Sequence, residues 1–208
     1  MSTTTRVPRT RLSPEQRRVQ LLDLGVQLLA HRSLDELSID VLAEEAGISR
    51  GLLYHYFGNK TEFHEAVVRH AAADLLDKTV PPDGGEPLER LLASVAAYVD
   101  YVLENFDGYV SLVRGAAGGN ETLRGISEEV RDVLGERVFL EDADFGIVPD
   151  NPRNRLLVRG WLAMAEELVI SWHQNPSQVT REDLLAMIAT ALPSWVGGVD
   201  AITNAKGA

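Results

Sequence analysis

Residues 37–63 read LSIDVLAEEAGISRGLLYHYFGNKTEF and carry the clearest structural signal in the chain. Apolar residues recur at helical spacing over 38–45 and again over 49–56, and each run begins with a serine, a residue that favours the N-cap of a helix. Residues 46–48, Ala-Gly-Ile, separate the two runs, and glycine favours the turn that ends a helix. We therefore predict two short helices joined by a short turn.

This helix pair has two interpretations. The apolar side chains that could pack the two helices together are Leu42, Ala43, Ile48, Leu53 and Phe57. Such packing occurs in ordinary helical hairpins as well as in DNA-binding helix-turn-helix motifs, and these residues alone favour neither. In the DNA-binding case the helix over 49–56 enters the major groove, where arginine can pair with guanine, small or apolar groups contact thymine methyls and ring groups donate to phosphate. The candidate contacts on this helix are Ser49, Arg50, Gly51, Leu52, Tyr54 and His55.

Residues 43–60 follow the pattern A-x-x-A-G-I-S-R-G-x-L-Y-x-Y-F-x-x-K, which is similar to the signature of the tetracycline-repressor (TetR) family of dimeric transcriptional regulators. The resemblance favours DNA binding over plain packing. It implies that Tyr54 and His55 contact phosphates or bases, that Phe57 belongs to the core and that Lys60 reaches a phosphate. It also implies a phosphate contact for Ser38, at a position where family members commonly carry serine or threonine.

Charge is distributed unevenly along the chain. The net charge of −11 argues against a polyanionic partner, but residues 1–70 hold nine basic and nine acidic side chains, and residues 71–208 hold the other 11 and 22. An acidic body behind a neutral head would help to orient the head toward DNA. The first residues are predicted to form a basic arm. On its own, such an arm is usually a solvated tail. By the resemblance, it could instead touch the minor groove. Its candidate DNA contacts are Arg6, Arg9 and Arg11.

The rest of the chain predicts an all-α protein of about nine helices, because apolar residues recur at spacings of three and four and no stretch alternates like a strand. The further predicted helices are Ser13 to about His31, Lys60–Lys78, Pro87–Phe106, 107–116, 121–140, 152–174 and a last one from Thr180 that Pro193 kinks or ends. The predicted units are a flexible basic arm (1–12), a three-helix helix-turn-helix DNA-binding domain (13–58), a connecting helix (59–80), a ligand-binding and dimerisation domain (81–200) and a frayed tail (201–208).

The family resemblance implies that the last two long helices pair with those of a second copy in a four-helix interface. A homodimer also follows from the motif, because operators read by one short helix per chain are two-fold symmetric with half-sites about 34 to 36 Å apart. The apolar residues that this interface and the core would share are Leu157, Trp161, Met164, Leu168 and Trp172.

By the same resemblance, a cavity for a small molecule lies between the helix over 87–106 and the helices that follow it. Aromatic and aliphatic candidates favour an apolar or aromatic effector, and Arg114 would meet a carboxylate if it pointed inward, although such residues are more often ordinary core. The candidate ligand-binding residues are Tyr98, Tyr101, Val102, Phe106, Tyr109, Leu112, Arg114, Trp161, Met164 and Ala165.

Other functions find little support. No G-x-S-x-G or comparable nucleophile motif indicates an enzyme, and the glycines before Lys60 miss the spacing of a phosphate loop, so no nucleotide or other cofactor is expected. His64, Glu65 and His70 lie at the wrong spacing for a metal pair, so no metal is expected. No signal peptide is apparent, the charged residues within 156–172 oppose a membrane span, and the lack of cysteine fits the cytoplasm.

We therefore expect a cytoplasmic, homodimeric regulator, a repressor that a small, largely apolar effector releases from a palindromic operator. The alternatives are an activator or co-repressor-dependent regulator of the same fold, and a helical interaction adaptor without DNA binding.

Overall fold

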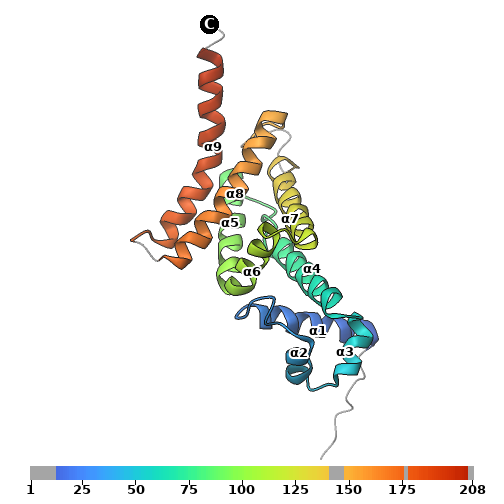
Figure 1. Ribbon diagram of the computed structural model, residues 1–208. Coiled ribbons are helices and arrows are strands. Elements are labelled where there is room, and N and C mark those ends of the chain that lie inside the picture. Colours follow the sequence, from blue (N-terminus) through green and yellow to red (C-terminus); the bar gives the residue numbers. More distant parts are fainter. Residues whose placement is uncertain (1–12, 141–147, 176–177, 206–208) are drawn as a thin grey trace, which may run out of the picture.

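The computed structural model describes residues 13–140, 148–175 and 178–205, and within these ranges it contains helices and no strand. The all-α prediction is confirmed (Figure 1). The helices are α1 (Pro14–Leu29), α2 (Ile39–Ala46), α3 (Arg50–Phe57), α4 (Lys60–Lys78), α5 (Pro87–Glu104), α6 (Phe106–Ala117), α7 (Glu121–Leu140), α8 (Pro152–Gln174) and α9 (Arg181–Ala205).

The first helices begin where local signals predict. The side chains of Ser13, Ser38 and Ser49 each accept a hydrogen bond from the backbone N–H three residues ahead, so each serine caps a helix. Gly47 ends α2 with a φ of 63°, a left-handed conformation that glycine adopts without steric cost. Figure 1 shows α1, α2 and α3 gathered at one end of the molecule, with α4 leading from them into the larger helical body.

Of the two outcomes predicted for Pro193, a kink or a helix end, the structure shows the kink, and the predicted frayed tail from residue 201 is wrong. α9 continues through Pro193 to Ala205, so residues 201–205 are helical and only 206–208 of the predicted frayed tail lie outside the described residues. Proline removes one backbone hydrogen bond, but Leu192 and Val196 are buried on either side of it and hold both halves of the helix against the body. The helix bends instead of ending (Figure 1).

Two hydrophobic clusters divide the core. The first joins α1–α4 to Leu123 and Ile126 of α7, and the second joins α5, α8 and α9. α6 lies against α1 so closely that a Cβ added at Gly108 would stand 2.6 Å from the carbonyl oxygen of Leu29. The backbone N–H of Leu34, which follows α1, donates to Ser111 Oγ of α6 at 2.9 Å. The end of the molecule formed by α1–α3, called the head below, and the larger body are therefore in direct contact through α6 as well as through α4.

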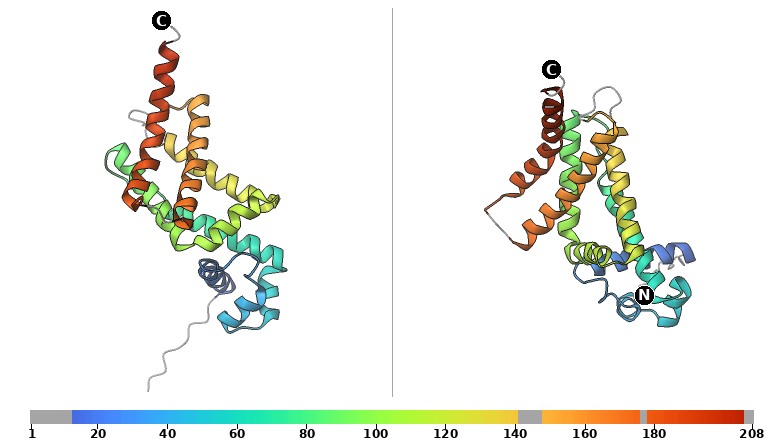
Figure 2. Two further views of the ribbon diagram at one scale, coloured as in Figure 1. Left: turned by 60° about the vertical axis from the view of Figure 1, so that its left-hand side comes forward. Right: turned by 45° about the horizontal axis from the view of Figure 1, so that its top comes forward.

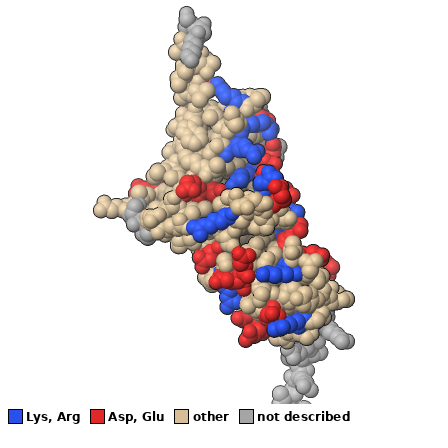
Figure 3. Space-filling view, in the orientation of Figure 1, with Lys and Arg blue, Asp and Glu red and all other residues tan. Residues whose placement is uncertain are grey.

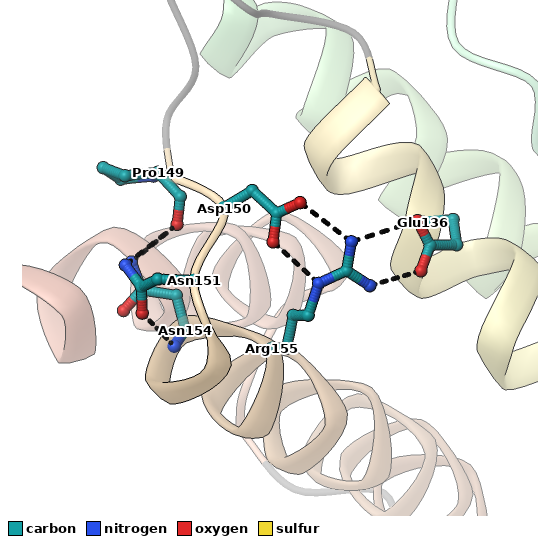
Figure 4. Close-up of polar contacts among 6 residues, drawn as sticks. All are labelled: Glu136, Pro149, Asp150, Asn151, Asn154 and Arg155. Carbon is teal, nitrogen blue, oxygen red and sulfur yellow. Dashed lines mark hydrogen bonds and ion pairs between the residues drawn. The ribbon is translucent and has the colours of Figure 1, made fainter.

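Polar contacts fix the start of α8 beside the end of α7 (Figure 4). The Arg155 guanidinium lies between the carboxylates of Asp150, at 2.7 Å, and Glu136, at 2.5 Å. The fully buried Asn154 donates through Nδ2 to the carbonyl oxygen of Pro149 at 2.8 Å. Most of the predicted surface loop 141–150 lies outside the described residues.

α9 is the most apolar long helix, and much of it is exposed. By length and composition alone, Arg181–Thr203 is the one described segment that could cross a membrane, yet only 22% of its most apolar window is buried. One such helix is weak evidence of a span, because core helices of soluble proteins pass the same test. α8 packs against α9, and in Figures 1 and 2 the C-terminal part of α9 projects from the body. This helix therefore presents an apolar surface that the rest of its own chain does not cover.

Candidate DNA-binding surface and ligand cavity

The second helix of the helix-turn-helix buries one face and exposes the other. Leu53 and Phe57 of α3 are buried in the first cluster, and Phe57 lies against Phe63 of α4 with ring centroids 5.2 Å apart. The residues exposed on α3 are Arg50, Gly51, Leu52, Tyr54 and His55. The structure thus places all the predicted base-edge candidates of α3 on one accessible surface.

Arg50 has a partner that sequence reasoning missed. Its Nε lies 2.5 Å from Asp40 Oδ1 on α2, and both side chains are mostly exposed. An exposed pair of this kind adds little stability, but it limits the orientations of the guanidinium. Because two Nη groups remain for a bidentate contact with guanine, Asp40 can orient Arg50 without occupying it. The pair spans two helices, so no spacing rule within one helix reveals it.

Three further DNA-contact candidates, Ser38, Ser49 and Lys60, lie at helix N-termini. Ser38 and Ser49 use their Oγ atoms to accept from the backbone of α2 and α3, which leaves each hydroxyl hydrogen free to donate. Lys60 is the first residue of α4 and is exposed. Partial positive charge at a helix N-terminus favours an anion, so these positions suit phosphates.

The face of the head that Figure 3 draws has no continuous basic patch in its described part. Figure 3 shows acidic and basic side chains side by side on the lower part of the molecule, which α1–α3 form. The arginines predicted as minor-groove contacts, Arg6, Arg9 and Arg11, lie outside the described residues.

A cavity of about 180 Å³ lies where the two hydrophobic clusters meet. Leu29 and Val68 of the first cluster line it from one side, and Val95 and Ile188 of the second line it from the other. Six predicted ligand-binding residues are in its wall: Tyr98, Tyr101, Tyr109, Leu112, Trp161 and Ala165.

The other four predicted ligand-binding residues lie elsewhere. Val102 is buried in the second cluster, and Met164 packs against the same cluster outside the cavity. Phe106 begins α6 and lies against the His173 ring, with centroids 3.9 Å apart. Arg114 is exposed and does not line the cavity, so the inward orientation that its carboxylate contact would require is not found. One face of α6 points away from the cavity, and spacing along the sequence does not reveal which face that is.

Four polar side chains form a chain of hydrogen bonds in the cavity wall. Tyr98 and Tyr109 share a hydrogen bond between their hydroxyls at 2.8 Å, and Tyr109 donates to Glu166 Oε2 at 3.0 Å. Arg131 of α7 binds the other Glu166 oxygen at 2.7 Å. Burial raises the pKa of both tyrosines, so the two hydroxyls stay protonated and act as the donors of this chain.

The cavity also has a charged lining, which was not predicted from the sequence. Arg90, Arg131, Arg137 and Glu166 all line it, together with the hydroxyl groups of Thr79 and Ser94. A signal was present, since Glu166 interrupts an otherwise apolar run within 156–172, and a carboxylate on an apolar helix often has a polar partner inside. For metals, the described residues contain no group of three or more His, Asp or Glu side chains that could hold an ion.

Comparison with known proteins identifies both halves of the chain. Residues 21–67 match the family described as "Bacterial regulatory proteins, tetR family", and residues 87–192 match "Tetracyclin repressor-like, C-terminal domain". A solved tetR-family transcriptional regulator from Streptomyces coelicolor is 33% identical, with a TM-score of 0.79 over 93% of this chain and 87% of that one.

Two more distant relatives differ in what is known of them. The transcriptional activator FasR of Mycolicibacterium smegmatis is 23% identical over 190 residues, which cover 90% of this chain and 85% of FasR. A transcriptional regulator from Saccharomonospora viridis, solved in complex with choline, is 16% identical, with a TM-score of 0.66 over 88% of this chain and 96% of that one. At this identity the second likeness concerns the fold alone.

Proposed function

The chain belongs to the tetR family of bacterial regulatory proteins, and on this premise we propose that it is a repressor that leaves a palindromic operator when a small molecule fills its cavity. It is a helix-turn-helix, DNA-binding transcriptional regulator, and its relatives are regulators, not enzymes. A cytoplasmic location is part of the proposal, because the operator lies there.

For the DNA contact, the proposal rests on the exposed face of α3. Arg50 would read a guanine, with Asp40 orienting its guanidinium. Tyr54 and His55 would donate to phosphates or base edges from the same face. The N-termini of α2 and α4, with Ser38 and Lys60, would hold phosphates on either side and fix the register of α3 in the groove.

For the homodimer, support comes from small and apolar residues exposed on the last two helices. We define the dimer face as the exposed residues at helical spacing on α8 and α9, which are Leu156, Gly160, Ala163, Met187, Thr190, Ser194, Gly198, Ala201 and Ile202. Leu156 is 72% exposed and Ile202 61%, unusual values for such large apolar side chains. Glycine and alanine on the same face let two helices approach closely, so a second copy is the occupant that this face fits best. Trp161, by contrast, is buried within the chain and donates to the carbonyl oxygen of Ile188.

The position of the cavity suggests how a ligand could release DNA. Its wall includes Leu29 and Leu34 of the head and Gly108 of α6, which contacts α1 directly. A ligand between the clusters would favour the conformation in which they stand further apart, and that conformation would change the spacing of the two α3 helices in the dimer. Release requires only that the ligand bind this conformation better, and a shift of occupancy from 1:99 to 99:1 needs about 5.5 kcal/mol.

Activation is the second candidate function. It is favoured by one observation, that FasR, a relative aligned along 90% of this chain, is named as an activator. Operator position relative to the promoter separates the two, because a bound dimer that overlaps the promoter blocks transcription.

The experiment that tests the DNA-binding proposal is selection of bound duplexes from a random-sequence pool. Wild-type protein is expected to enrich a palindrome, whereas the double variant Arg50→Ala, Tyr54→Ala is expected to enrich nothing. The matched control is Arg114→Ala, an exposed arginine in the body, and it should retain the palindrome. Enrichment of the same palindrome by the α3 double variant would refute the assignment of the α3 surface.

A further inference from the structure

One end of the cavity presents an arginine whose contact is with a neutral group. Arg137 Nη1 donates to Thr79 Oγ1 at 3.1 Å, and Thr79, only 2% exposed, donates in turn to the carbonyl oxygen of Leu75 at 2.7 Å. Ser94 Oγ donates to the carbonyl oxygen of Thr79 at 3.1 Å. Arg137 lies on α7, Thr79 directly follows α4 and Ser94 lies on α5. All three line the cavity.

Among the described residues that line the cavity, one carries a carboxylate, and Arg137 does not contact it. The glutamate, Glu166, already binds Arg131 at 2.7 Å and accepts from Tyr109 at 3.0 Å. Arg137 contacts no carboxylate within residues 13–140, 148–175 and 178–205. A half-buried cation without a counter-charge is costly, and an anion entering the cavity would relieve that cost.

Apolar side chains lie beside Arg137 and Ser94 in the wall and limit the size of a ligand. Leu134 and Val138 flank Arg137 on α7, and Leu91 and Val95 flank Ser94 on α5, all lining the same cavity. An apolar cavity of roughly 150 Å³ can hold benzene, so about 180 Å³ suits an apolar body of one aromatic ring or a short alkyl chain.

We propose that the cavity takes a small monocarboxylate, with its carboxylate on the guanidinium of Arg137 and its apolar body between α5 and α7. A planar guanidinium offers two parallel N–H donors that match the two oxygens of a carboxylate. A quaternary ammonium ligand fits less well, because Glu166 would have to give up Arg131 to receive it. The proposal rests on the proposed function for its regulatory role, since the same carboxylate would be the effector.

Calorimetric titration of the DNA-free protein tests the site independently of DNA. The probes are phenylacetate and octanoate, each compared with its neutral counterpart, 2-phenylethanol or 1-octanol, and with choline. We expect at least one carboxylate to bind at least about tenfold more tightly than its alcohol, since hydrogen bonds to charged groups are the stronger ones. Arg137→Gln is expected to remove this preference, and Arg137→Lys to retain part of it. The control Arg124→Gln, on the exposed side of the same helix, should bind as wild type does.

Three results would overturn the proposal: no binding of either carboxylate, equal binding of carboxylate and alcohol, or an unchanged preference in a folded Arg137→Gln protein. Tighter binding of choline would instead assign the cavity to cations. Operator binding by the wild-type protein is measured separately, so failure of the DNA-binding function is distinguished from failure of the ligand site. Carboxylate binding that leaves operator affinity unchanged would refute the effector role.

Discussion

The head and the body of this regulator are specified by the sequence in different ways. In the head, three serines cap the first three helices, a glycine turns the chain, and the DNA-contacting candidates on α3 all lie within eight residues. In the body, the cavity is assembled from α1, α4, α5, α6, α7, α8 and α9. Local signals therefore define the candidate DNA-contacting surface, whereas long-range packing defines the candidate ligand cavity.

The largest expected effect comes from breaking the dimer face without touching the head. Gly198→Arg places a charge on the exposed face of α9, where an added Cβ meets no atom within 4 Å, so the monomer should fold. Replacing helical glycine also removes a penalty of about 1 kcal/mol. We expect this variant to be a monomer in analytical ultracentrifugation. Because a monomer no longer couples two half-sites, its operator affinity should be at least about 100-fold lower.

Gly125→Arg is the matched control, because Gly125 also lies in a helix, α7, and an added Cβ there also meets nothing within 4 Å. It should leave a dimer with unchanged operator affinity. A dimeric Gly198→Arg protein with full affinity would move the dimer interface away from α9.

The next prediction is that alanine substitutions at two glycines of the head, Gly51 and Gly47, have different effects on stability. At Gly51, on the exposed face of α3, an added Cβ meets nothing within 4 Å, so Gly51→Ala should keep or raise the free energy of unfolding, by up to about 1 kcal/mol. Gly47 has a φ of 63°, so Gly47→Ala should lower the free energy of unfolding by about 1–2 kcal/mol. If α3 lies deep in the groove, the added methyl of Gly51→Ala should nevertheless weaken operator binding about tenfold.

Urea unfolding and fluorescence anisotropy on the selected operator measure the two quantities separately. Full DNA affinity in Gly51→Ala would show that α3 does not approach the groove closely at this position. An undiminished stability in Gly47→Ala would contradict the strain argument for the turn.

The same contrast explains how far the sequence could predict this structure. Helix starts followed from caps, since Ser13, Ser38, Ser49 and Asn151 each bond the backbone of the helix they precede. The end of α9 did not follow from local signals, because burial on both sides of Pro193 outweighs the backbone hydrogen bond that proline removes. Helix ends depend on tertiary packing, which local signals do not report.

The ligand candidates show the same limit. Six aromatic or apolar residues could be assigned to the cavity from helical spacing and family resemblance, but Arg114 could not be distinguished from Arg137. Both are arginines on amphipathic helices, and only the rotation of α6 and α7 in the packed body decides which one faces inward. Likewise, the Arg50–Asp40 contact depends on the angle between two helices.

The smallest expected effect is a pH dependence confined to the head. The His64 ring on α4 is half-buried, and its Nε2 lies 2.5 Å from the carbonyl oxygen of Leu37, the residue before the cap of α2. Burial is the main cause that lowers the pKa of His64 below its usual 6.5, with a smaller contribution from Lys60, against the opposing effects of the Leu37 carbonyl and Asp35. The unfolded chain therefore takes up this proton more readily than the folded one, and folding stability is lost as pH falls below about 6.5.

Urea unfolding at a series of pH values from 7.5 to 5 measures this loss. His64→Gln keeps an N–H donor for Leu37 but cannot titrate, so its stability should fall less steeply over the same range. His70→Gln is the matched control on the same helix, because His70 faces Asp23 of α1 at 2.7 Å and its loss should leave the contribution of His64 in place. If wild type and His64→Gln lose stability in parallel, the acid sensitivity of the head does not come from this histidine. If only His64→Gln flattens the profile, one half-buried imidazole links α4 to the turn before α2, and this link does not involve the cavity.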